Sequence, residues 1–259
     1  LTGPAVALAL QLFDGDPQQT RSVLGDDPAI DSAISVAMLS QKRYGDALQA
    51  WERITLDERR LKYHDLSETL IATLNQAGHF RDAAAATAAI SDDPSTRPVL
   101  GTVNNGSFEN GVKLRNAPAF EWQIADGREP QIGLSEGSKH SGRYGLMFTF
   151  NTFQTADFRE LKQLIPVEPG ATYRLDIWFR AALKTSSKFK FEALDATTQQ
   201  VLGSVDIPLQ SDWANGNVAF TVPDGADGVQ LRLTRDGCIG VACPTSGNLW
   251  LDDISLSRK

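Results

Sequence analysis

The chain has 259 residues, of which 41% are hydrophobic and 22% are charged, a balance typical of a folded globular protein. Its net charge of -7 and the lack of a stripe of Lys and Arg argue against nucleic acid as a partner. The sequence holds no run of roughly 20 apolar residues, so it predicts no membrane-spanning helix. Because the chain does not begin with Met, we interpret it as a fragment or a processed form.

Residues 1–98 are predicted to form an all-α domain. Three Asp-Pro pairs, at positions 16–17, 27–28 and 93–94, match a helix N-cap followed by proline at the first helical position. These pairs therefore predict where three helical segments begin.

One segment of this half occurs twice. "YGDALQAWERI" at 44–54 aligns with "FRDAAAATAAI" at 80–90, 36 positions later, and each copy follows another apolar helical stretch. The pattern covers roughly residues 30–92 and resembles the tetratricopeptide repeat, in which paired helices cross at small residues. The resemblance implies a platform that docks a protein partner, and Trp51 is expected to pack between helices. A helical-hairpin bundle unrelated to that family is the alternative.

From residue 103 onward, apolar and polar residues alternate in short segments separated by Gly, Pro, Asn and Asp. The segments include "RYGLMFTFN", "TYRLDIWFRA", "KFKFEAL", "GNVAFTV", "GVQLRLTR" and "NLWLDDISLS". At least eight such strands predict a β-sandwich over 103–259, joined to the helices by a linker at 99–102. The expected fold class is α+β in two domains: all-α helical-hairpin repeats, then an all-β jelly-roll sandwich.

Several segments of the second half, in order, resemble carbohydrate-binding modules of the family 4/9 type, within the galactose-binding-like jelly rolls. These segments are "NGSFENG", "FEWQI", "SEGSKHSGRYGLMF", "LKQLIPVEPGATYRLDIWFRA" and "LWLDDISL", and they span residues 103–257. The resemblance implies a structural calcium ion held by Glu109 and Asp252. Backbone carbonyls of the loop "EGSKHSG", from Ser138 and Lys139, are expected to complete its shell.

Alternation in the last strand favours Asp252 over Asp253 as the ligand. Ile254 and Leu256 are expected to face the core, which would place Asp252 on their side of the strand and Asp253 on the other. A buried carboxylate needs compensation, which a cation would supply. The alternative is that Asp252 only caps backbone amides.

The strand "YRLDIWFRA" is predicted to present a saccharide site on its outer face. Tyr173, Leu175, Ile177 and Phe179 share the core face, whereas Arg174, Asp176, Trp178 and Arg180 share the other. A tryptophan between charged groups offers a sugar an apolar surface beside hydrogen-bonding partners. The alternative is that a loop or the helical domain covers this face.

Three other tryptophans lie in the second half. Trp122 and Trp213 fall in turn-rich segments, where they could line a binding edge or plug the end of the barrel. Trp250 alternates with Asp252 and is predicted to belong to the core.

The chain has two cysteines, Cys238 and Cys243, which bracket "IGVA" in a Gly-rich loop. Two thiols without further ligands do not complete a tetrahedral metal shell, so we expect a local disulfide, with free thiols as the alternative. A disulfide requires an oxidising compartment, which favours a periplasmic or extracellular protein.

Catalytic patterns are weak. His64, His79 and His140 are scattered without metal-ligand spacing, and His79 and His140 are expected to be exposed bystanders. The sequence therefore predicts a non-enzymatic protein that has no catalytic residues and binds a polysaccharide or oligosaccharide. We expect it to act in the assembly, retention or export of a bacterial extracellular polysaccharide. A structural or protein-interaction jelly roll is the first alternative, and a glycoside hydrolase the second.

Overall fold

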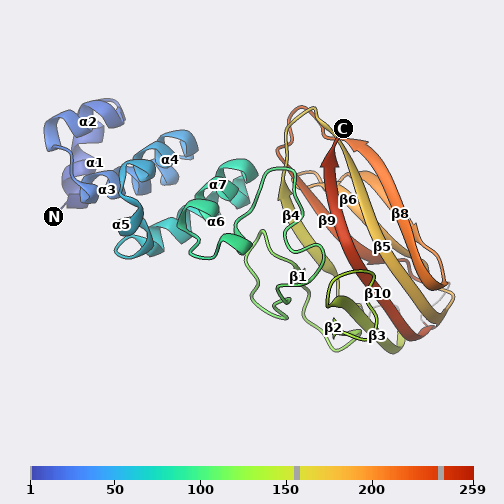
Figure 1. The fold of residues 1–259 in the computed structure, drawn as a ribbon. Helices are drawn as coiled ribbons and strands as arrows, with labels where there is room; N and C mark the ends of the chain where they lie inside the picture. The colour runs from blue at the N-terminus through green and yellow to red at the C-terminus, as the bar shows by residue number, and fades with distance from the viewer. Residues whose placement is uncertain (1, 155–157, 239–241) are drawn as a thin grey trace. The chain divides into compact units, whose positions relative to one another are not determined.

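The computed structural model describes residues 2–154, 158–238 and 242–259. The chain divides into two compact units, Leu1–Asp92 and Asp93–Lys259. The first unit is helical and the second is built of strands, as Figure 1 shows in the change from labelled coils to labelled arrows. The predicted fold class is therefore confirmed.

The first unit is a series of short helices joined by tight turns. They are α1 (Thr2–Leu12), α2 (Pro17–Leu24), α3 (Pro28–Ser40), α4 (Tyr44–Arg53), α5 (Leu56–Arg60), α6 (His64–Ala77) and α7 (Phe80–Ile90). Among the described residues, no helix is long and apolar enough to cross a membrane.

The Asp-Pro pairs begin helices as the sequence predicted. The side chain of Asp16 accepts hydrogen bonds from the backbone N–H groups of Gln18 and Gln19 and caps α2. Asp27 caps α3 in the same way, and Asp93 caps the short 3-10 helix η1 (Pro94–Thr96). Proline follows each cap at the start of the helix.

The two copies of the repeated segment form α4 and α7. Tyr44 and Phe80 are the first residues of these helices, and the alanines at matching positions, Ala47 with Ala83 and Ala50 with Ala86, are buried. Small side chains at these positions let α4 pack against α3, and α7 against α6. The indole of Trp51 is buried, and its N–H donates to the hydroxyl of Ser67 on α6, as expected of packing between helices.

The second unit is a sandwich of two antiparallel sheets. Its described strands are β1 (Gln123–Ile124), β2 (Gln131–Ser135), β3 (Gly145–Gln154), β4 (Leu161–Pro166), β5 (Thr172–Thr185), β6 (Phe189–Asp195), β7 (Val201–Ile207), β8 (Gln210–Thr221), β9 (Gly228–Arg235) and β10 (Ala242–Arg258). One five-stranded sheet has the order β1-β4-β9-β6-β7, and the other has the order β2-β3-β10-β5-β8. We call the second one the β5 sheet.

The core lies between the two sheets and is formed by the apolar residues that occupy every second position of the strands. On β5, every second residue from Tyr173 to Phe179 is at most 3% exposed, as the alternation predicted. Their neighbours, including Asp176 and Trp178, lie on the outer face of the β5 sheet and are half-buried. This outer face carries the candidate site.

The predicted linker at 99–102 contacts the sandwich. The N–H of Gly101 donates to the carbonyl of Pro166 at 2.7 Å, and a Cβ added to Gly101 would lie 2.9 Å from the ring of Tyr173. By its internal contacts the chain divides between Asp92 and Asp93, earlier than the predicted end of the helical domain at residue 98. The extent of an independently stable helical domain stays a prediction.

Gly106, in the turn at the start of the second unit, meets the last strand at close range. Its carbonyl accepts a hydrogen bond from the N–H of Ile254 at 3.0 Å, and a Cβ at this position would lie 1.9 Å from the carbonyl oxygen of Ile254. The turn can therefore close against β10 only with a glycine here.

We expect Gly106→Ala to lower the free energy of unfolding by about 3 kcal/mol, the upper range for forcing extra volume into a packed site. The urea midpoint of the full chain measures this loss. Gly133→Ala is the matched control, because a Cβ at Gly133 has no atom within 4 Å. Equal midpoints for the two variants would contradict the close approach.

Candidate functional site

Asp252 lies on the outer face of the β5 sheet, and the predicted placement on the core side is wrong. It is directly opposite Trp178 of β5, and the pairing register shifts between Asp252 and Ser255. Leu251 and Ile254 both face the core although they are three positions apart. The reason is a bulge, in which Asp253 has a φ of 44° and resets the alternation.

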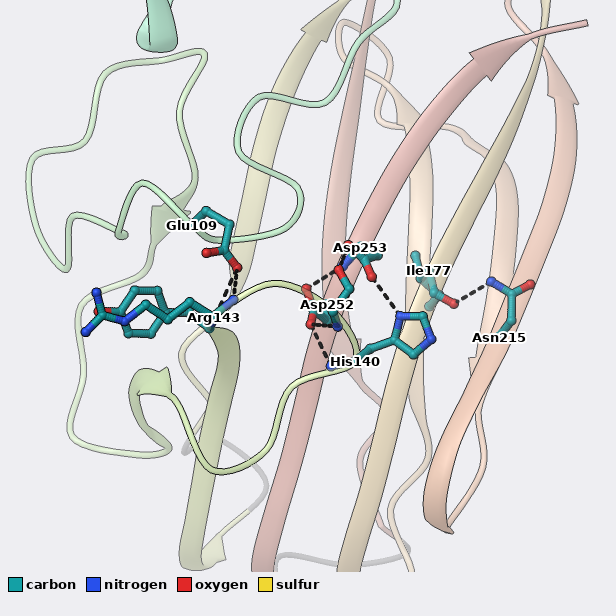
Figure 2. Close-up of polar contacts among 9 residues, drawn as sticks. Glu109, His140, Arg143, Ile177, Asn215, Asp252 and Asp253 are labelled. Atoms are coloured by element: carbon teal, nitrogen blue, oxygen red, sulfur yellow. Dashed lines mark hydrogen bonds and ion pairs between the residues drawn. The ribbon is translucent and has the colours of Figure 1, made fainter.

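The carboxylate of Asp252 is buried by a loop rather than by the core. The 136–144 loop connects β2 to β3 and crosses over this part of β10, as Figure 2 shows. The Oδ2 atom of Asp252 accepts hydrogen bonds from the backbone N–H groups of His140, at 2.7 Å, and Ser141, at 3.1 Å. Its Oδ1 atom accepts from the N–H of Asp253 at 2.8 Å. Burial raises the pKa of the Asp252 carboxyl above its usual value, and these three hydrogen bonds oppose that rise.

Glu109 holds the other end of the same loop. Its Oε1 atom accepts hydrogen bonds from the backbone N–H groups of Arg143, at 2.8 Å, and Tyr144, at 3.1 Å. In Figure 2 the carboxylates of Glu109 and Asp252 lie on either side of the loop backbone. The two acids implied by the family resemblance are thus brought to one loop, which both of them cap.

Glu109 and Asp252 make the contacts expected of acids that cap backbone amides, which was the alternative to a calcium site. A shared calcium ion needs oxygen atoms directed at it, whereas both oxygens of Asp252 and one of Glu109 accept backbone N–H groups. Among the described residues, no three His, Cys, Asp or Glu side chains cluster as a metal site. As arranged here, Glu109 and Asp252 fit capping better than a shared cation, and the ion stays a prediction.

Ser138 and Lys139, the expected carbonyl ligands, make other contacts through their side chains. The hydroxyl of Ser138 accepts a hydrogen bond from Nη1 of Arg180 at 3.0 Å. The Nζ atom of Lys139 donates to the carbonyl of Glu136 at 3.1 Å. The first contact joins the 136–144 loop to β5, and the second lies within the loop.

Three aromatic rings gather on the outer face beside this loop. The imidazole of His140 stacks on the indole of Trp178, with ring centroids 3.7 Å apart and an angle of 13° between the planes. The ring of Trp213, from β8, meets His140 edge-on at 5.9 Å. We call His140, Trp178 and Trp213 the aromatic face.

Polar side chains continue the aromatic face along β5 and β8. Opposite Trp178 lies Asn215, whose Nδ2 donates to the carbonyl of Ile177 at 3.2 Å, and Asn217 follows two positions later. Arg174 and Asp176 form a bidentate ion pair with N–O distances of 2.8 and 2.9 Å. Rings beside amides and charged groups form a surface suited to a ligand that has both apolar faces and hydroxyl groups.

Two residues assigned from the sequence lie beneath the loop instead. The guanidinium of Arg180 lies 4.9 Å from the ring centre of Trp250, directly across from it on β10. Trp250 is 8% exposed, but it belongs to this outer layer and not to the sandwich core, because it alternates with the core residues Leu249 and Leu251. Arg180 therefore supports the loop rather than lining the aromatic face.

Trp122 is a core residue, and its interpretation as a ligand contact is wrong. It is 2% exposed, its ring lies 5.7 Å from that of Phe108 and 6.3 Å from that of Phe191, and its N–H donates to the carbonyl of Asn105. A buried, hydrogen-bonded indole plugs the sandwich, which was the alternative reading of its turn-rich segment.

His140 is a part of the aromatic face that sequence reasoning missed. It was expected to be an exposed bystander, but its Nδ1 atom lies 2.7 Å from Oδ2 of Asp253. Its partners Asp253 and Trp178 lie far along the chain, so only its position in a glycine-flanked loop before a strand could have pointed to it. His64 and His79 belong to the helical unit.

The predicted disulfide is confirmed. Cys238 and Cys243 are bonded, with their Cα atoms 5.3 Å apart. The bond joins Cys238 to the second residue of β10, and residues 239–241 between them fall outside the described residues.

Comparison with known proteins gives a family and several similar folds. One solved structure, described as "CBM4 structure and function", is 20% identical over 61% of this chain and 99% of that one, with a TM-score of 0.45. The enzymatically active domain of bacteriophage CBA120 tailspike protein 4 is 15% identical over 61% of this chain and 21% of that one, with a TM-score of 0.45. TmCBM61, solved with β-1,4-galactotriose, is 18% identical over 60% of this chain and 96% of that one, with a TM-score of 0.43.

A search of curated proteins finds no match to this chain. The family model described as "Carbohydrate binding domain" matches residues 100–237, which is more than half of the chain. The chain therefore belongs to the carbohydrate binding domain family of the 4/9 type.

Proposed function

We propose that this chain is a non-enzymatic, exported protein that binds a polysaccharide or oligosaccharide on the aromatic face and docks a protein through its helices. The setting we propose is the assembly, retention or export of a bacterial extracellular polysaccharide. Family membership supports carbohydrate binding, and the Cys238–Cys243 disulfide supports a periplasmic or extracellular location.

The observation that carries the proposal is the composition of the aromatic face. A sugar ring has an apolar C–H face and a polar rim, so its binding surface needs a flat ring beside hydrogen-bonding groups. On this sheet the rings of His140 and Trp213 lie next to Asn215, Asn217 and the Arg174–Asp176 pair. The outer face of β6 and β9 carries instead an ion pair of Arg232 with Glu192.

A glycan array followed by calorimetry tests the proposal. The full chain is expected to bind at least one polysaccharide of the array, and Trp213→Ala is expected to weaken that binding while the fold is kept. Val201→Ala serves as the control, because Val201 is exposed on β7 of the other sheet. Absence of binding to every glycan at millimolar concentration would refute the carbohydrate claim.

The helical unit supports the proposed protein docking less directly. Its two hairpins of similar sequence, 36 positions apart, resemble a tetratricopeptide-type array, and an array of that type would offer an extended surface to a partner. Cross-linking of the full chain in its native cell envelope, with photoreactive groups placed on α3 and α6, would identify such a partner.

One observation favours a second candidate function, a jelly roll that binds protein and no sugar. His140 covers one face of Trp178, which removes that face as a platform for a sugar ring. The glycan array separates the two candidates. The third candidate, a glycoside hydrolase, predicts new reducing ends when the chain is incubated with the glycan it binds.

Calcium at Glu109 and Asp252 remains a proposal based on the family resemblance. An ion present at about 100 times its dissociation constant would stabilise the fold by roughly 2.7 kcal/mol. The melting temperature would then rise by several degrees, Asp252→Asn would weaken the rise, and magnesium would substitute poorly. A melting curve that is the same in excess chelator and in millimolar calcium would leave amide capping as the role of Asp252.

A further inference from the structure

One face of Trp178, the tryptophan expected to stack on a sugar, is already covered. The imidazole of His140 lies 3.7 Å from it and nearly parallel, so the two rings are in full contact. A sugar ring cannot stack on the same face of Trp178 while His140 is there. The ring that a ligand meets at this position is therefore His140.

His140 is fixed in place on several sides. Its Nδ1 atom is 2.7 Å from Asp253, and its backbone N–H donates to Asp252 at 2.7 Å. The next residue, Ser141, donates its hydroxyl to the other oxygen of Asp253 at 2.9 Å. Glu109 caps the end of the same loop. The backbone and Ser141 contacts fix the loop from which the ring extends, and rotating the ring off Trp178 would break its own contact with Asp253, so we treat the ring as part of the surface.

The contact with Asp253 determines which side of the imidazole is available. A carboxylate only accepts hydrogen bonds, so the Nδ1 atom carries the proton in this pair. When the ring carries this proton alone, its Nε2 atom is an acceptor. Figure 2 shows the second ring nitrogen of His140 turned away from Asp253. A hydroxyl group that approaches along the aromatic face can donate to it.

The charges of the surrounding side chains favour an uncharged ligand. Arg174 is paired with Asp176, and Asp253 is bonded to His140, while Arg180 lies beneath the loop, where it donates to Ser138. An acidic sugar would therefore have to compete with Asp176 for Arg174. Hydroxyl groups can bond to Nε2 and to the amides of Asn215 and Asn217, each of which makes only part of its possible hydrogen bonds within the surface.

We infer that His140 is the specificity-determining residue of the aromatic face, that Asp253 positions it, and that the ligand is a neutral, hydroxyl-rich glycan. In this arrangement a sugar hydroxyl donates to Nε2 of His140, and the sugar ring contacts Trp213. The inference rests on the proposed carbohydrate function. It adds which residue selects the ligand and whether that ligand is charged.

The test compares the wild-type chain with His140→Phe, which keeps a flat ring over Trp178 but has no ring nitrogen. Calorimetry would use three neutral polysaccharides, a soluble β-glucan, a xylan and a galactan, and one acidic polysaccharide, polygalacturonate. We expect the wild type to bind a neutral member more tightly than polygalacturonate. We expect His140→Phe to bind it at least about tenfold more weakly, with an unchanged urea midpoint, and Val201→Ala to bind as the wild type does.

Nitrogen-15 NMR of the histidine rings gives a second readout, and its ligand titration on the wild type does not depend on how any variant folds. In the wild type, His140 is expected to show the Nδ1–H tautomer, and in Asp253→Ala it is expected to lose it. When an oligosaccharide of the polysaccharide that binds is added to the wild type, the Nε2 signal of His140 is expected to shift. Equal affinity of His140→Phe and wild type, or an Nε2 signal that does not move, would overturn the role of His140 and leave carbohydrate binding intact. Tighter binding of polygalacturonate would overturn the ligand class. Failure of the wild type to bind any of the four would overturn the ligand class inferred here, whereas only failure on the whole glycan array would overturn the proposed function.

Discussion

Asp252→Ala is expected to lower the free energy of unfolding of the sandwich by about 3 kcal/mol, the low end for three N–H groups at about 1–3 kcal/mol each, since these groups are only part-buried. The change removes the acceptor of three backbone N–H groups, those of His140, Ser141 and Asp253. Relief of burying the carboxylate offsets part of this loss, because burial disfavours its charged form. Urea unfolding of the full chain, followed by the fluorescence of the sandwich tryptophans, measures the change.

Asp253→Asn is the matched control for this prediction, because asparagine tolerates the φ of 44° at this position. Asp253 is the adjacent acid, its side chain is 28% exposed, and its partners are the side chains of His140 and Ser141 rather than buried backbone groups. We expect it to cost less than about 1 kcal/mol, as solvent-accessible pairs do. Similar losses of unfolding free energy in the two variants would mean that capping of backbone amides does not make Asp252 more stabilising than Asp253.

The pKa of Asp252 gives a second, pH-dependent difference. Because its folded-state pKa is raised from 3.8, the folded chain takes up this proton at a higher pH than the unfolded chain does. The stability that protonation contributes is fully present below pH 3.8 and is lost as the pH rises through the folded-state pKa. Asp252→Asn removes this titration, so the free energy of unfolding of the wild type should fall relative to Asp252→Asn as the pH is raised through that window. A difference that stays constant from pH 3.5 to 7, within the error of urea unfolding, would contradict the raised pKa.

The strands and their two faces could be predicted from the sequence because they follow from a period of two. The alternation from Tyr173 to Arg180 assigns each side chain of β5 to the correct face. The same rule fails on β10, because the bulge at Asp253 inserts one residue and reverses the faces beyond it. "LDDISL" alternates well enough to hide this bulge, and no glycine marks it.

The aromatic face could be predicted only in part, since it is assembled by a loop from elsewhere in the chain. Trp178 was recognised from its own strand, whereas His140 reaches it across the sheet from the 136–144 loop. Which side chain of that loop lands on Trp178 depends on where Asp252 and Glu109 cap the loop backbone. Those hydrogen bonds join residues that are up to 112 positions apart, and no local pattern encodes such pairings.

Trp122→Ala is expected to lower the free energy of unfolding by about 3–5 kcal/mol, the range for removing a large aromatic side chain from a packed core. The indole is 2% exposed, contacts the rings of Phe108 and Phe191, and donates its N–H to Asn105. Its loss would leave a cavity and remove one of the two hydrogen bonds to the carbonyl of Asn105, which also accepts from the backbone N–H of Phe108. Trp213→Ala is the matched control, because the half-buried Trp213 lies on the outer face of β8, where truncation leaves no cavity in the core.

The two tryptophan variants should therefore separate stability from ligand binding. Trp122→Ala should shift the urea midpoint strongly, and under conditions where it is still folded it should bind glycan as the wild type does. Trp213→Ala should keep a midpoint near that of the wild type and lose affinity, because its ring belongs to the surface that the ligand meets. If Trp122→Ala were as stable as the wild type but bound glycan weakly, Trp122 would be a ligand contact, and its assignment to the core would be wrong.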